Sequence, residues 1–406
     1  MSRRLAVWLY DVRVADLEAR GTDIRLRYTN AALEMWPANT AVVSCSMLVS
    51  RAWHPARVFL RGLLPEGDHL RQVAAVANVA ASDTFALLAR YGRDVAGALV
   101  ITPHDQAPDE SRWEAIPYTP AGLAADVVAV DENSTAWIHD DSELSLAGIQ
   151  NKLLLISDGT GGWARPAGGR PSTHVLKIDD AARPGLVAAE YHALRLAQSV
   201  GLSNLEPELA AIGDRVCLIV RRFDRIIDQG SVQRVHQEDA CQALRIDQDA
   251  NGGRGKYEDS GGPSLRDVAG LLRRYGRDPI EELAALFRLT VLNVVVGNAD
   301  AHGKNISVLL NRDGHIKVTP AYDIVPTVLW PRLRRHPAMA VNGCADITSI
   351  SFDDLVAEGA RWGLERNRCG RLIGDLSGLI AEVTIEHSPL AHHVRTMLDH
   401  LARPSA

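Results

Sequence analysis

The segment GNADAHGKN, residues 297–305, places an aspartate, a histidine, a lysine and two asparagines within nine positions. It follows an apolar run at 289–296, and its two glycines bracket the polar residues, so a loop is predicted there. Asp300 and Asn305 lie five positions apart in this loop, and Asp323 lies in a later loop between prolines. Two carboxylates and a carboxamide are hard oxygen ligands of the kind that Mg²⁺ prefers.

These residue types suit phosphoryl transfer. The reaction needs an aspartate to orient the accepting hydroxyl, oxygen ligands for a metal ion, and a lysine on a strand for the nucleotide phosphates. Lys177 lies upstream on a predicted strand, so the chain runs lysine strand, D-x-x-x-x-N loop, metal aspartate, which is the kinase order. Singly, such an aspartate is usually a turn former and such a lysine is usually solvated. The order therefore carries the prediction.

His302 follows Asp300 by two positions, and a metal-dependent phosphohydrolase could use such a pair as ligands. No second H-x-H or H-D pair completes a site of that kind. We therefore expect His302 to pack or hydrogen-bond within the loop and to help position Asp300, with metal ligation as the minority alternative.

The nucleotide-covering loop has the weakest sequence signal. The chain has neither G-x-G-x-x-G nor G-x-x-x-x-G-K-[ST]. Before the lysine strand stands SLAGIQNK, residues 145–152, with one glycine and backbone amides that could form an anion-binding nest.

The elements that must position these residues form a strand-rich half followed by a helix-rich half. Strands and hairpins are predicted at 4–30, 153–156, 175–178, 215–225 and 306–311, and helices at 82–92, 187–201, 239–246, 265–274, 279–297 and 353–385. A length of 406 residues suits two or three domains. Such a two-lobed layout commonly places a ligand in the cleft between the lobes.

Composition excludes several classes of protein. The net charge of −6 argues against a surface that grips nucleic acid throughout, and the basic stretches 273–277 and 332–335 are expected to be solvated helix ends. Five scattered cysteines with no C-x-x-C favour neither a disulfide framework nor a zinc site. No apolar run approaches the ~18–20 residues of a membrane span. A cytoplasmic protein without membrane contact is expected.

Motifs along nearly the whole chain resemble those of one family. They are LAVWLYDVRVADL, FLRGLLPEGDHLRQ, DTFALLARYGRDVAGAL, SLAGIQNKLLL, STHVLKI, EYHALRLAQSVGL, RRFDR, HQEDACQAL, KYEDSGGP, GNADAHGKNISVLL and TPAYDI. In this order they resemble the HipA family, the serine/threonine kinase toxins of bacterial type II toxin–antitoxin modules.

The resemblance implies an α+β, bilobal protein-kinase-like fold with an additional small N-terminal β-rich domain. The expected domains are the N-terminal subdomain at 1–110, a linker at 111–136, the kinase N-lobe at 137–225 and the helical C-lobe at 226–406.

The resemblance also implies roles for site residues. Asp300 would be the catalytic aspartate, with Lys177 and His302 beside it at the reaction centre, and Asn305 and Asp323 would hold Mg²⁺. The expected ATP-binding residues are the phosphate loop Ala147, Gly148, Ile149, Gln150, Asn151 and Lys152, then Lys177, the backbone around Arg221 and Phe223 for adenine, Asp224 and Gln237 near the ribose, His302 and Asp323.

Ser145, in the phosphate loop, matches the autophosphorylation site of the family. A phosphate there adds roughly two negative charges beside an ATP site, which would expel the loop and silence the enzyme. Arg221 stands where family members often have an acidic residue, a change of little consequence if main-chain groups hold the adenine.

The implied partners are an aminoacyl-tRNA synthetase, typically the glutamyl enzyme, as the substrate whose phosphorylation inhibits translation, and a small helix-turn-helix antitoxin resembling HipB. Operator DNA would be met mostly through the antitoxin. A kinase-like scaffold that acts as corepressor is an alternative, against which the joint presence of Asp300, Asn305, Asp323 and Lys177 argues. A kinase with a small-molecule or tRNA acceptor is another, which the sequence leaves open.

Overall fold

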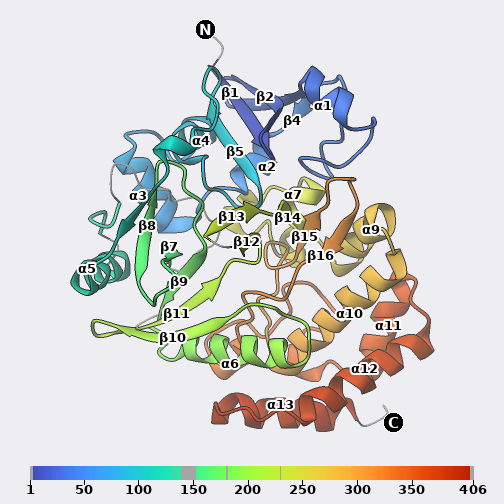
Figure 1. Ribbon diagram of the computed structural model, residues 1–406. Coiled ribbons are helices and arrows are strands. Elements are labelled where there is room, and N and C mark those ends of the chain that lie inside the picture. Colours follow the sequence, from blue (N-terminus) through green and yellow to red (C-terminus); the bar gives the residue numbers. More distant parts are fainter. Residues whose placement is uncertain (1–2, 133, 139–151, 180–181, 229, 403–406) are drawn as a thin grey trace. The chain divides into compact units, whose positions relative to one another are not determined.

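The structure is a computed structural model that describes residues 3–132, 134–138, 152–179, 182–228 and 230–402 (Figure 1). The chain forms two compact units. Unit 1 comprises Met1–Asp179, Glu208–Glu238 and Leu310–Gly314, and unit 2 comprises Asp180–Pro207, Asp239–Leu309 and His315–Ala406. Unit 1 holds most of the strands and unit 2 most of the helices, as the sequence pattern predicts.

The first sheet of unit 1 is antiparallel, with strand order β4-β3-β2-β1-β5. Its strands are β1 (Arg3–Leu9), β2 (Val12–Arg20), β3 (Asp23–Tyr28), β4 (His54–Pro55) and β5 (Leu99–Pro103). The helices in this part of the chain are α1 (Asn30–Met35), α2 (Arg57–Arg61), α3 (Gly67–Val76) and α4 (Thr84–Tyr91). The Asp83 side chain accepts a hydrogen bond from Ala86 N, so the predicted start of the helix near residue 82 is confirmed.

The second sheet of unit 1 carries Lys177 and has the order β10-β11-β9-β7-β8-β6. Its strands are β6 (Glu114–Pro117), β7 (Lys152–Ser157), β8 (Trp163–Ala167), β9 (His174–Ile178), β10 (Pro207–Ile212) and β11 (Arg215–Arg221), and β12 (Arg225–Asp228) forms a hairpin with β13 (Ser231–Arg234). One hydrophobic core takes side chains from both sheets. It therefore fixes the strand on which Lys177 lies.

The segment predicted as a linker, 111–136, is not an irregular connection. It contains strand β6, which pairs with β8, and helix α5 (Pro120–Asp131), which contacts β7. Thr119 caps this helix and Pro120 occupies its first turn, both strong helix-start signals. The expectation of a linker rested on the Pro- and Asp-rich composition upstream and missed these signals.

Unit 2 is organised around α10 (Pro279–Val296), which contacts α9, α11, α12 and α13 (Figure 1). Twelve of its eighteen residues are buried, and burial is continuous from Leu289 to Val296, where the apolar run lies. The surrounding helices are α6 (Leu186–Ser199), α7 (Ala240–Leu244), α8 (Ala250–Gly253), α9 (Leu265–Tyr275), α11 (Phe352–Trp362), α12 (Arg366–Ala381) and α13 (Ser388–Leu401). The single helix predicted at 353–385 is broken into α11 and α12 at Gly363, whose φ is 100°.

Short elements complete the fold. They are the strands β14 (Gln237–Asp239), β15 (Ser307–Leu310) and β16 (Ile316–Val318) and the 3-10 turns Glu110–Arg112, Glu258–Ser260, Thr327–Leu329 and Ile347–Ser349. Strand β15 matches the strand predicted directly after the polar loop. Among the described helices, none has both the length and the apolar character needed to span a membrane.

Candidate active site

The polar loop begins where α10 ends, at Gly297. This residue has φ 73°, and a Cβ there would lie 2.3 Å from Val328 Cγ2, so a side chain is excluded on both counts. Asn298 fixes the start of the loop to the end of α10. Its backbone N–H donates to Asn293 O (2.8 Å), and its side-chain amide donates to Asn293 Oδ1 (2.9 Å). Ala299 N donates to Thr327 Oγ1 (3.0 Å). The loop predicted from the glycines is therefore present and is fixed at its start.

The loop brings Asn305 back to Asp300. The Asn305 amide donates to the backbone oxygen of Asp300 (3.1 Å), which also accepts from His302 N (2.8 Å). Asp323 is close enough for its charge to raise the pKa of Asp300. The three predicted oxygen-bearing side chains are thus near one another in unit 2.

Asp323 has an unusual backbone for a residue with a side chain, with φ 53°. Aspartate tolerates this left-handed region better than most residues, but the conformation is still sparsely populated. Strain of this kind persists only where the surrounding structure fixes it, and it gathers at functional sites.

Tyr257 is a site residue that the sequence did not single out. Its hydroxyl donates to Asp300 Oδ1 at 2.9 Å. Burial raises the pKa of Asp300, the Tyr257 bond lowers it, and the nearby Asp323 charge raises it again. Lys256 and Arg334 act in the same direction as Tyr257. The Asp300 side chain is half-buried, and its pKa is raised overall because burial outweighs the neighbouring donors and cations that favour the ionised form.

The Arg334 guanidinium group lies over the Tyr257 ring, with its central carbon 4.8 Å from the ring centroid. Its Nη2 also forms an ion pair with Asp259 at 2.8 Å. The chain segment 256–259 and the segment at 334 are thereby joined next to Asp300. No spacing rule links these positions, so only the fold shows their connection.

His302 is buried and packs edge-on against Tyr257, with ring centroids 5.3 Å apart. Its Nδ1 lies 3.3 Å from Lys304 N, which donates to it. The ring therefore stabilises the turn between Asp300 and Asn305 by packing and by one hydrogen bond.

Lys304 supports the other side of the loop. Its Nζ forms an ion pair with Asp239 Oδ2 at 2.8 Å, and the two side chains are only 3% and 8% exposed. Asp239 also caps α7, since its Oδ1 accepts from Gln242 N (2.8 Å). The Tyr322 hydroxyl donates to Lys304 O at 2.7 Å, which ties the loop to the residue before Asp323. Asp239 lies 65 positions before Lys304 in the sequence, so no local spacing pattern predicts this pair.

Unit 1 carries the other predicted residues. Lys177 on β9 lies opposite Lys152 on β7 and opposite Leu218 on β11. Arg221 ends β11 opposite His174. Phe223 follows in the turn and is half-buried. Lys177, Lys152 and Arg221 are therefore held on neighbouring strands of one sheet.

Asp224 and Gln237 differ in their surroundings. Asp224 is buried, and its carboxylate accepts from Arg222 Nε (2.9 Å), Arg222 Nη2 (2.8 Å) and Gly97 N (2.7 Å). Its oxygens are engaged by protein donors. Gln237 is also buried, but its Oε1 has no hydrogen-bond partner among the described residues. Of the two residues expected near a ribose, Gln237 has the acceptor that a ligand hydroxyl could use.

The predicted phosphate loop is not part of the site as described. Ser145, Ala147, Gly148, Ile149, Gln150 and Asn151 lie outside the described residues. Lys152, the last residue of that motif, begins β7.

The oxygen ligands in unit 2 fit Mg²⁺. Two carboxylates and one carboxamide, from Asp300, Asp323 and Asn305, are hard donors near one another. Within the described part of the chain no three His, Cys, Asp or Glu residues form a metal cluster. A site with few protein ligands suits Mg²⁺, which keeps waters and accepts substrate phosphates.

The mixed fold, with a lysine strand in unit 1 and a D-x-x-x-x-N loop followed by an aspartate in unit 2, defines the class of protein as a kinase. Comparison with known proteins gives the family. The HipA N-terminal domain family matches residues 5–102, and the HipA-like C-terminal domain family matches residues 144–383. The chain belongs to the HipA family.

Individual relatives agree. The Y4mE protein of Sinorhizobium fredii is 35% identical over 96% of this chain and 93% of its own length. The serine/threonine-protein kinase toxin HipA of Shewanella oneidensis is 30% identical over 84% of this chain and 80% of its own. A solved complex of Shewanella oneidensis HipA with HipB and its operator DNA contains a chain of the same fold, with a TM-score of 0.80, 27% identity and coverage of 98% of this chain and 96% of that chain.

Proposed function

We propose that this kinase is a toxin of a toxin–antitoxin module that transfers the γ-phosphate of ATP to a serine or threonine of a protein. The observation that carries the proposal is the environment of Asp300, a half-buried carboxylate on a fixed loop beside Asn305 and Asp323. The Shewanella relative is named a serine/threonine-protein kinase toxin, which supports serine or threonine as the acceptor. An aminoacyl-tRNA synthetase is proposed as the target from the motif resemblance alone.

Asp300 would orient the accepting hydroxyl by taking a hydrogen bond from it and would receive its proton as the phosphate is transferred. Oδ1 already accepts from Tyr257, so the acceptor hydroxyl would use Oδ2. Tyr257 would then fix the rotamer of the carboxylate and keep it ionised at neutral pH. Preorganisation of this kind accounts for much of the catalysis in phosphoryl transfer.

Roles for the nucleotide-binding residues are proposed one by one. Asn305 and Asp323 would hold Mg²⁺, which neutralises charge on the phosphates when it is bound. Lys177 would contact the α and β phosphates, and the backbone near Arg221 and Phe223 would contact the adenine. Gln237, with its unpartnered buried Oε1, would accept a hydrogen bond from a sugar hydroxyl.

Regulation is proposed by similarity. The related Shewanella HipA forms a complex with HipB and operator DNA, which supports a helix-turn-helix antitoxin as the partner of this chain. The match of Ser145 to the family motif supports autophosphorylation at that serine. Replacing Ser145 with alanine should prevent self-silencing; an undiminished loss of activity in that variant, with phosphate at another site, would contradict the assignment.

The decisive experiment is incubation of the purified chain with ATP, Mg²⁺ and a cell extract, followed by mapping of new phosphosites. Asp300→Ala should abolish transfer, because it removes the carboxylate proposed to orient the hydroxyl. The matched control is Asp375→Ala, which removes an exposed carboxylate on α12. Full transfer by Asp300→Ala would refute the proposal.

Other results of the same experiment separate the alternatives. Phosphate on tRNA or on a small molecule instead of protein would change the acceptor class. Intact antitoxin binding with no transfer to any acceptor would favour a kinase-like corepressor.

A further inference from the structure

Unit 1 contains a buried network of charged side chains around Asp94 and Asp224. Asp94 is fully buried and pairs with Arg225 at 2.9 Å, and Asp224 pairs with Arg222 at 2.8 Å and with Arg225 at 3.0 Å. Arg234 is the fifth member, 3.9 Å from Asp94, with a side chain only 9% exposed. Three guanidinium groups thus face two carboxylates, which gives these five groups a net charge of +1.

Burial of net charge is costly unless it is compensated, so the position of the excess cation is informative. Arg222 and Arg225 each pair with a carboxylate within 3.0 Å, whereas the Arg234–Asp94 distance is longer. Arg234 is fixed by two hydrogen bonds to backbone oxygens, from Nη1 to Arg93 O (2.7 Å) and from Nη2 to Gly169 O (3.1 Å). These two bonds hold the Arg234 guanidinium group in one orientation.

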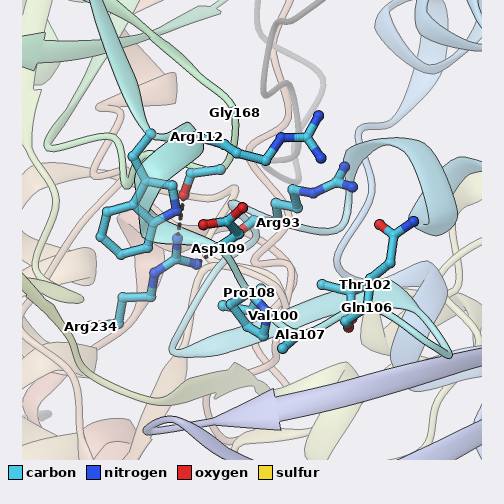
Figure 2. A pocket seen from close by; sticks show the side chains of 12 residues that line it. Arg93, Val100, Thr102, Gln106, Ala107, Pro108, Asp109, Arg112, Gly168 and Arg234 are labelled. Carbon is cyan, nitrogen blue, oxygen red and sulfur yellow. Dashed lines mark hydrogen bonds between the residues drawn. The ribbon is translucent and has the colours of Figure 1, made fainter.

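Arg234 lines a pocket of about 380 Å³ that is open to solvent. The other lining residues are Arg93, Val100, Thr102, Gln106, Ala107, Pro108, Asp109, Arg112, Trp113, Gly168 and Gly169. Figure 2 shows the side chains of Arg93 and Arg112 extending toward the same side of this pocket. Three arginines and one carboxylate give the lining a formal net charge of +2.

Two glycines shape the wall. A Cβ on Gly168 would lie 1.8 Å from Arg112 O, and a Cβ on Gly169 would lie 3.3 Å from both Arg93 Cδ and Trp113 Nε1. Both glycines also have positive φ, at 65° and 97°. Only glycine permits the backbone to approach Arg112 this closely, so the arginines, the indole and the backbone are held together by the fold.

We propose that this pocket is a second anion site, which binds a phosphate monoester group. Guanidinium groups recognise phosphate through paired, charge-assisted hydrogen bonds, and a dianion would offset the excess charge of the lining. Arg93 and Arg112 would contact the phosphate oxygens, and the fixed Arg234 would supply the field behind them. The same chemistry is offered by a free nucleotide and by a phosphorylated serine side chain, and the experiment distinguishes these sources.

The test is calorimetric titration of the full chain after a non-hydrolysable ATP analogue and Mg²⁺ have filled the kinase nucleotide site. Phosphoserine peptide, AMP and inorganic phosphate are titrated separately, with the unphosphorylated peptide as a blank. The probe variant is Arg93→Gln combined with Arg112→Gln. The matched control is Arg51→Gln, which removes an exposed arginine outside the pocket.

We expect at least one phosphate monoester to bind more tightly than the unphosphorylated blank, with an affinity that falls as salt is added. The double variant should weaken that binding at least about tenfold, since two charge-assisted contacts are lost, while Arg51→Gln leaves it within about twofold. Thermal unfolding of each variant checks that the fold is intact. Absence of binding to the analogue-saturated chain, or equal binding by the double variant, overturns the proposal. Because the nucleotide site is filled throughout, failure here leaves the kinase assignment untouched.

Discussion

Replacing Tyr257 with phenylalanine removes one oxygen atom next to the Asp300 carboxylate and leaves the ring in place. The hydroxyl donates to Asp300 Oδ1 at 2.9 Å, while the ring packs on His302 and beneath Arg334. Phenylalanine keeps both ring contacts. We therefore expect a correctly folded protein with a specific defect in phosphate transfer.

The size of the defect follows from the bond that is lost. A hydrogen bond to a charged group contributes about 1.5–3 kcal/mol, and 1.4 kcal/mol corresponds to about tenfold in rate. Transfer should therefore slow by about ten- to a hundredfold, chiefly in kcat, because Asp300 is no longer held in one orientation toward the acceptor. The KM for ATP should change little, since Tyr257 has no proposed contact with the nucleotide.

The pH profile provides a readout that a purely structural role would not move. The Tyr257 hydroxyl lowers the pKa of Asp300, whereas burial and Asp323 raise it. Without the hydroxyl the pKa rises further, so the acid limb of the rate profile moves to higher pH. Initial rates of labelled phosphate transfer, measured between about pH 5 and 8, report this shift.

The matched control for this change is Tyr275→Phe, which removes a hydroxyl at the end of α9. It should leave both the rate and the acid limb unchanged. Equal rates and an unmoved acid limb in Tyr257→Phe would show that Asp300 does not depend on this bond, and the positioning role would be abandoned.

Three further predictions concern stability. Burial raises the pKa of Asp300, so the folded protein binds the carboxyl proton more tightly than the unfolded chain does. Stability therefore decreases as pH rises through the pKa of Asp300 in the folded state. Asp300→Asn should raise Tm by about 1–3 °C at pH 7 while abolishing transfer. Lys304→Met should lower the free energy of unfolding in urea by about 3–5 kcal/mol, since it leaves Asp239 buried and unpaired, and adding Asp239→Leu should restore part of the loss. Burial lowers the pKa of His236 to about 4, so its contribution is fully present above its ordinary value near 6.5 and is lost as pH falls from there toward 4; Tm should drop over that interval in the wild type and less in His236→Gln.

Local signals were sufficient for the catalytic loop. An apolar run that ends at a glycine, polar residues at fixed spacing and β-branched residues afterwards predict a buried helix, a loop and a strand, and the structure has α10, the loop and β15 in that order. These signals are local because each depends on the backbone preference of a few neighbouring residues. Gly363 after Trp362 is also a helix-end signal, yet the predicted helix 353–385 continues past it. The structure ends α11 at this glycine.

The groups that tune the site could not be predicted in this way. Tyr257 and Arg334 meet Asp300 only because distant segments pack together, and no periodicity records such a meeting. The same holds for Asp224, which the R-F-D-R motif favoured as a ribose contact. The structure shows its carboxylate engaged by Arg222 and Gly97, so a nucleotide role for it stays a prediction that requires those bonds to be shared.

The loop combines features that destabilise the fold with contacts that compensate for them. Asp300 and Asp323 carry like charges close together, and Asp323 also has a left-handed backbone. The compensating contacts lie outside this pair: the glycine cap of α10, the Asn293–Asn298 bond and the buried pair of Lys304 with Asp239. A divalent cation held by Asp323 and Asn305 would offset this repulsion, so a site that is unfavourable when empty would become favourable when loaded. Stability alone would not select two neighbouring carboxylates of this kind. The chain keeps the rigid contacts around them because function requires the pair.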